Sequence, residues 1–161
     1  MKYISLFCLL LVSSFSYAQQ NQVKINNNSP ITVSYTLKSF NVKSSVRGCL
    51  PVIFNQIPVV LPSDRGEFYE THNSSYTAYY PINEWRVFAP DGSDTVYNVP
   101  GSLIDHTLTD QVEWKQITIN TPTGSYTLGE DCNGGGTNHI VAGGITMDLN
   151  YVNTIMNVDI Y

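Results

Sequence analysis

The side chains that could do chemistry are scattered along this chain, and few of them have the spacing of a catalytic site. Glu67 and Glu70 are a pair of carboxylates of the kind that a glycosidase places around its scissile bond. Ser102, Asp105 and His106 contain the residue types of a hydrolytic triad, but such close sequence neighbours do not normally converge on one nucleophile. The GxSxG, HExxH, phosphate-loop and dinucleotide signatures are absent. We therefore expect no enzymatic activity and no cofactor.

Metal binding has equally weak support in the sequence. Oxygen ligands for calcium occur in two turns, with Asp91 and Asp94 in the first and Asp131 in the second. Their spacing does not match an EF-hand, and Asp followed by Gly is also typical of ordinary turns. We predict no metal site and keep these three aspartates as weak calcium candidates. The three histidines share no spacing typical of zinc ligands: His72, His106 and His139.

Tyrosine is the unusual feature of the composition, with eleven residues in the chain. In an extended strand, Tyr76 and Tyr80 point to one face and Tyr79 to the other, so at least one ring faces solvent. Exposed aromatic rings with polar neighbours bind sugars and lipid headgroups. The alternative is that these tyrosines are half-buried strand residues. We take Tyr76, Tyr79 and Tyr80 as candidate ligand-binding residues and expect Trp85 and Trp114 in the core.

The N-terminus has the order of a secretory signal. Lys2 precedes an apolar stretch over residues 4–12, and small residues surround Ala18. We expect cleavage near Ala18, which leaves residues 19–161 as a single secreted or periplasmic domain. The leader contains Cys8, and because Phe7 precedes it a lipid anchor is disfavoured.

Two cysteines then remain, and they predict one disulfide. Cys49 and Cys132 form an even pair in an oxidising compartment. Neither has a CxxC spacing or a histidine at ligand spacing, so a catalytic or metal-binding thiol is the weaker interpretation.

The charge balance excludes some partners. Eight basic residues stand against thirteen acidic ones, for a formal net charge of −5. Because the chain has few Lys and Arg residues, its binding would release few counterions from a phosphate backbone, and we expect no nucleic-acid partner. Beyond the leader, no apolar run is long enough for a transmembrane segment.

The elements that must position these residues are strands. Residues 31–37 alternate apolar and polar side chains, and residues 145–151 and 156–160 predict a C-terminal hairpin. Pro58 makes the apolar run 52–61 either an edge strand or two short strands with a bulge at Pro58. The switch of apolar parity within residues 112–119 predicts a bulge or burial on both faces. Shorter β-rich runs cover residues 23–25, 76–80, 85–88, 95–99, 126–128 and 139–142.

The fold class follows from this pattern. Only residues 102–110 suggest a short helical turn, with Ser102 as its N-cap. Without helices for parallel crossovers, we predict an all-β antiparallel two-sheet sandwich of about eight to ten strands.

Three functional hypotheses remain. The leading one is a secreted non-enzymatic binding or interaction module that recognises a glycan, a lipid headgroup or a protein, with exposed aromatics as one means. The alternative is a structural or assembly subunit that pairs through strand edges. The least favoured is a small secreted hydrolase that uses loop carboxylates. Asn27 and Asn73 match the N-glycosylation acceptor pattern, and their use stays open.

Overall fold

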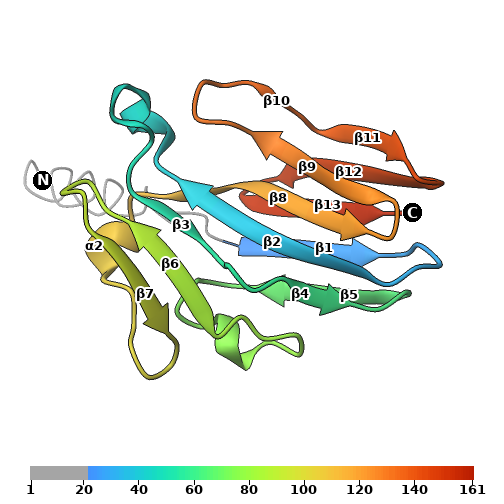
Figure 1. The fold of residues 1–161 in the computed structure, drawn as a ribbon, viewed down its shortest axis with the longest axis horizontal. Coiled ribbons are helices and arrows are strands. Elements are labelled where there is room, and N and C mark those ends of the chain that lie inside the picture. The colour runs from blue at the N-terminus through green and yellow to red at the C-terminus, as the bar shows by residue number, and fades with distance from the viewer. Residues whose placement is uncertain (1–21) are drawn as a thin grey trace, which may run out of the picture.

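The structure, a computed structural model, describes residues 22–161 as two packed β-sheets (Figure 1). The all-β sandwich is confirmed. The predicted leader, residues 1–18, lies outside the described residues. The smaller sheet has the order β11 (His139–Ala142), β12 (Ile145–Val152), β13 (Ile155–Ile160), β1 (Gln22–Asn27) and β5 (Arg65–Tyr69). The larger sheet has the order β10 (Gly136–Thr137), β9 (Gly124–Glu130), β8 (Glu113–Thr121), β2 (Val33–Phe40), β3 (Val52–Phe54), β6 (Glu84–Phe88) and β7 (Asp94–Asn98), with β4 (Val59–Leu61) paired to β2.

The core lies between the sheets and follows the sequence alternation. In β2, Tyr35 and Leu37 are fully buried, while Thr36 and Lys38 lie on the outer face. In β13 of the smaller sheet, Val158 and Ile160 are buried on the face that packs against the larger sheet. Trp85 and Trp114 are also buried, which confirms their predicted place in the core.

Strand number and direction differ from the prediction. The described residues contain strands β1 to β13, more than predicted, because several have only two to five residues and show no clear alternation. The prediction of purely antiparallel sheets is wrong at one pair, since β1 runs parallel to β13, with Gln22 opposite Ile155 and Asn27 opposite Ile160. These are the first and last described strands, so no hairpin forces them to be antiparallel.

The two predicted irregularities are confirmed. The register between β2 and β8 shifts after Lys38. Lys38 pairs with Gln116, but the next residue, Ser39, pairs with Trp114, so Lys115 of β8 has no partner in β2 and forms the bulge. The run around Pro58 forms the two short strands β3 and β4, both paired to β2. The bulge lets Trp114 and Ile117 both reach the core in spite of their different parity.

The helical segments are short and correct two predictions. They are η2 (Val42–Arg47), η3 (Ser75–Thr77) and α2 (His106–Thr109). The turn predicted within 102–110 is present as α2, but its N-cap is Asp105, whose Oδ1 accepts the Thr107 N–H at 2.7 Å. Ser102 Oγ instead accepts the Asn98 N–H at 2.8 Å. The strand predicted at residues 76–80 is wrong, because η3 and an irregular segment occupy it.

A disulfide joins Cys49 to Cys132, as predicted. It links the turn after η2 to the connection between β9 and β10. The sequence separation is 83, for which the loop-closure entropy lost by the unfolded chain is about 4.5 kcal/mol.

Candidate functional site

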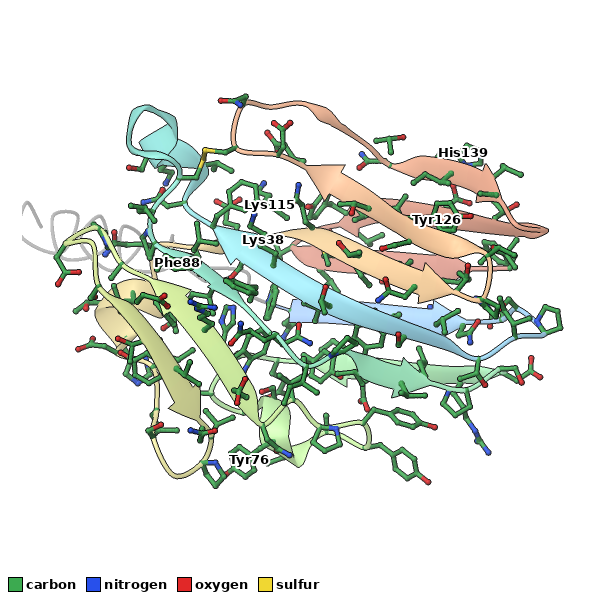
Figure 2. The ribbon with its side chains drawn as sticks, viewed as in Figure 1. Lys38, Tyr76, Phe88, Lys115, Tyr126 and His139 are labelled. Atoms are coloured by element: carbon green, nitrogen blue, oxygen red, sulfur yellow. A yellow bond between two sulfur atoms is a disulfide. The ribbon has the colours of Figure 1, made fainter. Side chains whose placement is uncertain are left out.

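The predicted tyrosine cluster is only partly brought together. The Tyr79 and Tyr80 rings pack edge to face with centroids 4.9 Å apart. Tyr79 is 83% exposed, and Tyr80 is half-buried. Tyr76 lies on η3 (Figure 2) and is also exposed, but it does not line the cleft, described below, that Tyr80 lines.

Two side chains of β5 hold the backbone N–H and the backbone carbonyl of Tyr80. The Glu67 carboxylate accepts the Tyr80 N–H through Oε2 and the Phe68 N–H at 2.8 Å through Oε1. The Tyr69 hydroxyl donates to the Tyr80 carbonyl at 2.6 Å, and the Tyr35 hydroxyl lies 2.6 Å from that of Tyr69. Burial raises the pKa of both Tyr35 and Tyr69, so both remain neutral phenols at physiological pH. Glu67 therefore has a structural role here, and Glu70 is exposed.

The segment after Tyr80 is fixed by the core. The Ile82 N–H donates to the Ser75 carbonyl at 3.3 Å, and Ser75 Oγ lies 2.7 Å from the Ile82 carbonyl oxygen. The Trp85 indole N–H donates to Ser75 Oγ at 2.9 Å, so the buried Ser75 is itself held in place. The Asn83 carbonyl accepts the Val99 N–H at 2.9 Å. Most backbone groups of residues 80–83 thus already have partners within the protein.

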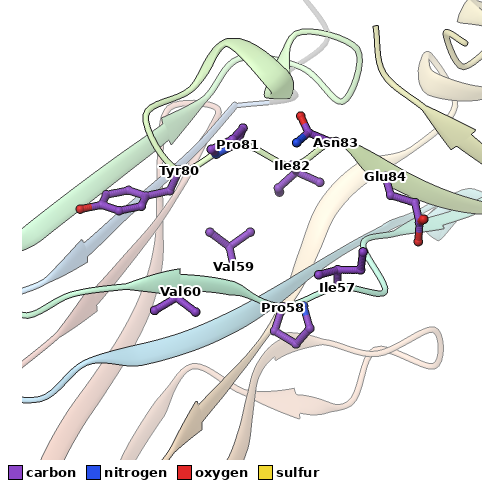
Figure 3. Close-up of a pocket in the computed structure, with 9 residues that line it drawn as sticks. All are labelled: Ile57, Pro58, Val59, Val60, Tyr80, Pro81, Ile82, Asn83 and Glu84. Atoms are coloured by element: carbon purple, nitrogen blue, oxygen red, sulfur yellow. The ribbon is translucent and has the colours of Figure 1, made fainter. Parts of the chain in front are cut away.

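A cleft separates this segment from β4 (Figure 3). Its volume is about 280 Å³. In the described residues, β4 pairs with β2 alone, so its outer edge carries no strand. Ile57 is 64% exposed and Val60 57% exposed, and both line the cleft. The lining residues are Ile57, Pro58, Val59, Val60, Tyr80, Pro81, Ile82, Asn83 and Glu84.

The aliphatic side of this cleft was missed from the sequence. The signal that could have found it is Pro58, because a proline that interrupts an apolar run leaves part of the following strand without its neighbour. Val60 is apolar but lies at an outward position of β4, which is visible only once the register with Ser34 is known.

The calcium candidates serve as turn and ion-pair residues. Asp91 Oδ1 accepts the Ser93 N–H at 2.9 Å, and this bond holds the pKa of Asp91 below its ordinary value. Asp94 binds the Arg86 guanidinium through two bonds of 2.7 and 2.6 Å, which lowers the pKa of Asp94. Asp131 Oδ1 accepts N–H groups of its own loop. Among residues 22–161, no group of three or more His, Cys, Asp and Glu side chains could hold a metal ion.

The histidines are not brought together. His72 is buried against the two tryptophans, and His106 is exposed at the start of α2. His139 is exposed on β11, where Nδ1 lies 2.6 Å from Asp148 Oδ1. The Asp105 carboxylate caps α2, which begins at His106, through the Thr107 N–H, while Ser102 accepts the Asn98 N–H, so the residues resembling a triad have structural bonds of their own.

Both glycosylation sequons contain structural asparagines. Asn27 is fully buried, and its amide nitrogen lies within 2.8 Å of the Ile31 carbonyl oxygen. The side chain of Asn73 makes two bonds of 2.9 Å with the backbone of Ile104, one as donor and one as acceptor. A glycan on either side chain would replace a hydrogen of the amide nitrogen that donates to these carbonyls.

Comparison with protein-family models, with curated proteins and with solved structures found no match. No helix within residues 22–161 is long and apolar enough to cross a lipid bilayer.

Proposed function

We propose that this protein is a non-enzymatic binding module, exported after cleavage near Ala18, that holds an extended polypeptide segment in the cleft between β4 and residues 80–84. The observation that carries the proposal is the unpaired outer edge of β4, which faces an apolar wall. An unpaired edge presents backbone N–H and C=O groups that an added strand can satisfy.

The two walls of the cleft have different chemistry, which favours a peptide. The β4 wall has an edge that no strand pairs, although its Leu61 carbonyl accepts the Asn27 amide, while the backbone of Tyr80 and Ile82 in the opposite wall is already bonded within the protein. A strand added to β4 would therefore pair with it through its backbone, and the alternate side chains that point to one face of the sheet would contact Tyr80 and Pro81.

The residues that line the cleft disfavour a sugar as its ligand. The lining offers few polar side chains for a ring of hydroxyls, chiefly Asn83, Glu84 and the Tyr80 hydroxyl. Glycan or lipid-headgroup recognition through Tyr76, Tyr79 and Tyr80 is the competing proposal. Edge pairing between copies of the chain is a third, with a second copy as the added strand.

The test is a peptide selection with variants of the cleft and matched controls. Residues 19–161 would be panned against a phage library of random linear peptides, and enriched peptides would be synthesised and titrated by calorimetry. Ile57→Ser and Val60→Ser remove the apolar side chains of the cleft. Val141→Ser and Val152→Ser are controls on the other sheet, since these valines are 68% and 56% exposed, close to the 64% and 57% of the cleft residues.

We expect each cleft variant to weaken the selected peptides about tenfold, the effect of losing one buried aliphatic side chain, with both controls unchanged. N-methylation of alternate peptide residues should abolish binding in one register, because it removes the donors that pair with β4. Equal binding by all variants would refute the cleft as the site. A glycan or vesicle that binds instead, and is lost in Tyr79→Ala, would refute the polypeptide ligand in favour of the competing proposal. Mass that rises with concentration and is lowered by Val60→Ser would favour a second copy as the partner.

A further inference from the structure

A second hollow lies on the outer face of the larger sheet, away from the cleft of β4. It has a volume of about 440 Å³ and crosses β2 between β8 on one side and β3 and β6 on the other. Figure 2 labels two of its residues, Lys38 and Phe88, on β2 and β6. The residues that line this groove are Thr36, Leu37, Lys38, Gly48, Leu50, Val52, Phe54, Phe88, Gln116 and Thr118.

The groove has one apolar and one polar wall. Phe54 and Phe88 form the apolar wall, with ring centroids 5.8 Å apart and planes inclined by 27°. Gln116 and Thr118 of β8 form the polar wall, opposite Lys38 and Thr36 of β2 in the sheet register. A pyranose ring has the same two-sided character, because its C–H face packs on aromatic rings while its hydroxyls bond amide and hydroxyl side chains.

The charge in the groove has the opposite sign to that of the chain. The chain has thirteen acidic and eight basic residues, yet Lys38 is the sole charged residue among the groove-lining set. Its ammonium lies 5.9 Å from the Phe40 ring centroid and forms no ion pair within residues 22–161. The neighbouring cation, Arg86, lies over the Phe88 ring and is already neutralised by Asp94. Among the groove-lining residues, Lys38 is therefore the cation available for an anionic group.

We propose that this groove binds an acidic oligosaccharide, with a sugar carboxylate at Lys38 and the adjacent ring against Phe54. Two interactions would favour binding: a charge-assisted hydrogen bond between the Lys38 ammonium and the carboxylate, and apolar contact between the sugar ring and the wall formed by Phe54 and Phe88. This site shares no lining residue with the cleft of β4, so the two proposals stand independently.

The probe is an oligogalacturonate, compared with an uncharged galactan oligomer of equal length. Both would be titrated into residues 19–161 by calorimetry. Lys38→Met keeps the aliphatic stem and removes the charge, and Lys24→Met, on an exposed lysine of the smaller sheet, is its matched control. Thermal unfolding of each variant checks that the fold is retained.

We expect Lys38→Met to weaken oligogalacturonate binding about tenfold, the usual effect of losing one charge-assisted hydrogen bond, with Lys24→Met unchanged. Added salt should weaken wild-type binding more than Lys38→Met binding. Phe54→Leu should weaken binding in low and high salt alike, because it acts through ring contact. No binding at millimolar concentration, equal binding of the neutral oligomer, or equal losses in Lys38→Met and Lys24→Met would each overturn the proposal. Ile57→Ser should leave this binding intact, so failure here is distinct from failure of the peptide site.

Discussion

Mild acid should destabilise this protein through one buried histidine. The His72 ring stacks on Trp114 with centroids 4.1 Å apart and meets Trp85 edge-on at 4.9 Å. Its Nε2 shares a 2.8 Å hydrogen bond with Ser39 Oγ. Burial lowers the pKa of His72 from 6.5 to about 3, because the imidazolium would lose its hydration inside the core.

The sign and size of the effect follow from proton linkage. Between these two pKa values the unfolded chain binds a proton at His72 and the folded protein does not. This contribution to stability is fully present above pH 6.5 and is lost as the pH falls, by about 1.4 kcal/mol for each pH unit. The loss amounts to about 3 kcal/mol at pH 4 and levels off near the folded-state pKa of about 3, a large share of a typical domain stability.

The assay is urea unfolding at a series of pH values, followed by tryptophan fluorescence. His72→Phe keeps a ring between the tryptophans but removes the titrating group, and Ser39 Oγ retains a bond to the Ile53 carbonyl at 3.3 Å. The stability change from pH 8 to pH 4 should be about 3 kcal/mol smaller in this variant than in the wild type. The control is His106→Phe, at an exposed histidine, which should follow the wild type. Parallel pH profiles for wild type and His72→Phe would refute the assignment of His72 as a buried neutral group.

Three further substitutions test the fold. Replacing Cys49 and Cys132 together by Ser should lower the free energy of urea unfolding by about 4.5 kcal/mol, since the disulfide closes a separation of 83, and an unchanged midpoint would contradict this. Asn27→Ala should cost about 2 kcal/mol in the same assay, because the carbonyls of Ile31, Leu61 and Pro62 lose a donor, whereas the exposed Asn28→Ala should be close to neutral. Tyr69→Phe should cost about 1–3 kcal/mol by removing the bonds to Tyr35 and to the Tyr80 carbonyl, and equal stability would mean that these bonds are unimportant.

The parts of the fold predicted correctly are those that local pattern determines. Alternation places Tyr35 and Leu37 in the core because a strand with one buried face must carry its apolar residues at every second position. The parity switch in β8 predicted a bulge or burial on both faces, and the structure has the bulge at Lys115. The C-terminal hairpin was predictable because both strands alternate and Asn153 between them is a common turn residue. In the structure Asn153 has a positive φ of 55° in that turn.

The errors occur where distant contacts override local preference. Tyr76, Tyr79 and Tyr80 are good strand residues, yet Ser75 is drawn into the core by Trp85 and the carbonyl of Ile82, which turns the chain into η3. The parallel pairing of β1 with β13 joins residues at opposite ends of the sequence. Neither segment has a local sequence pattern that indicates which strand it pairs with.

One wall of the cleft of β4 could be predicted from local sequence, and the other depends on distant contacts. Pro58 is a local signal, and it correctly divides the run into β3 and β4, so that β6 pairs with β3 and leaves the edge of β4 open. The opposite wall depends on Glu67 and Tyr69, which hold the Tyr80 backbone from the smaller sheet. A gap between two extended segments would normally close if one wall could move to pair with the other. Because residues 80–83 are bonded elsewhere, this wall cannot supply a strand to β4, and a ligand that pairs there would meet a preformed surface at a low entropic cost.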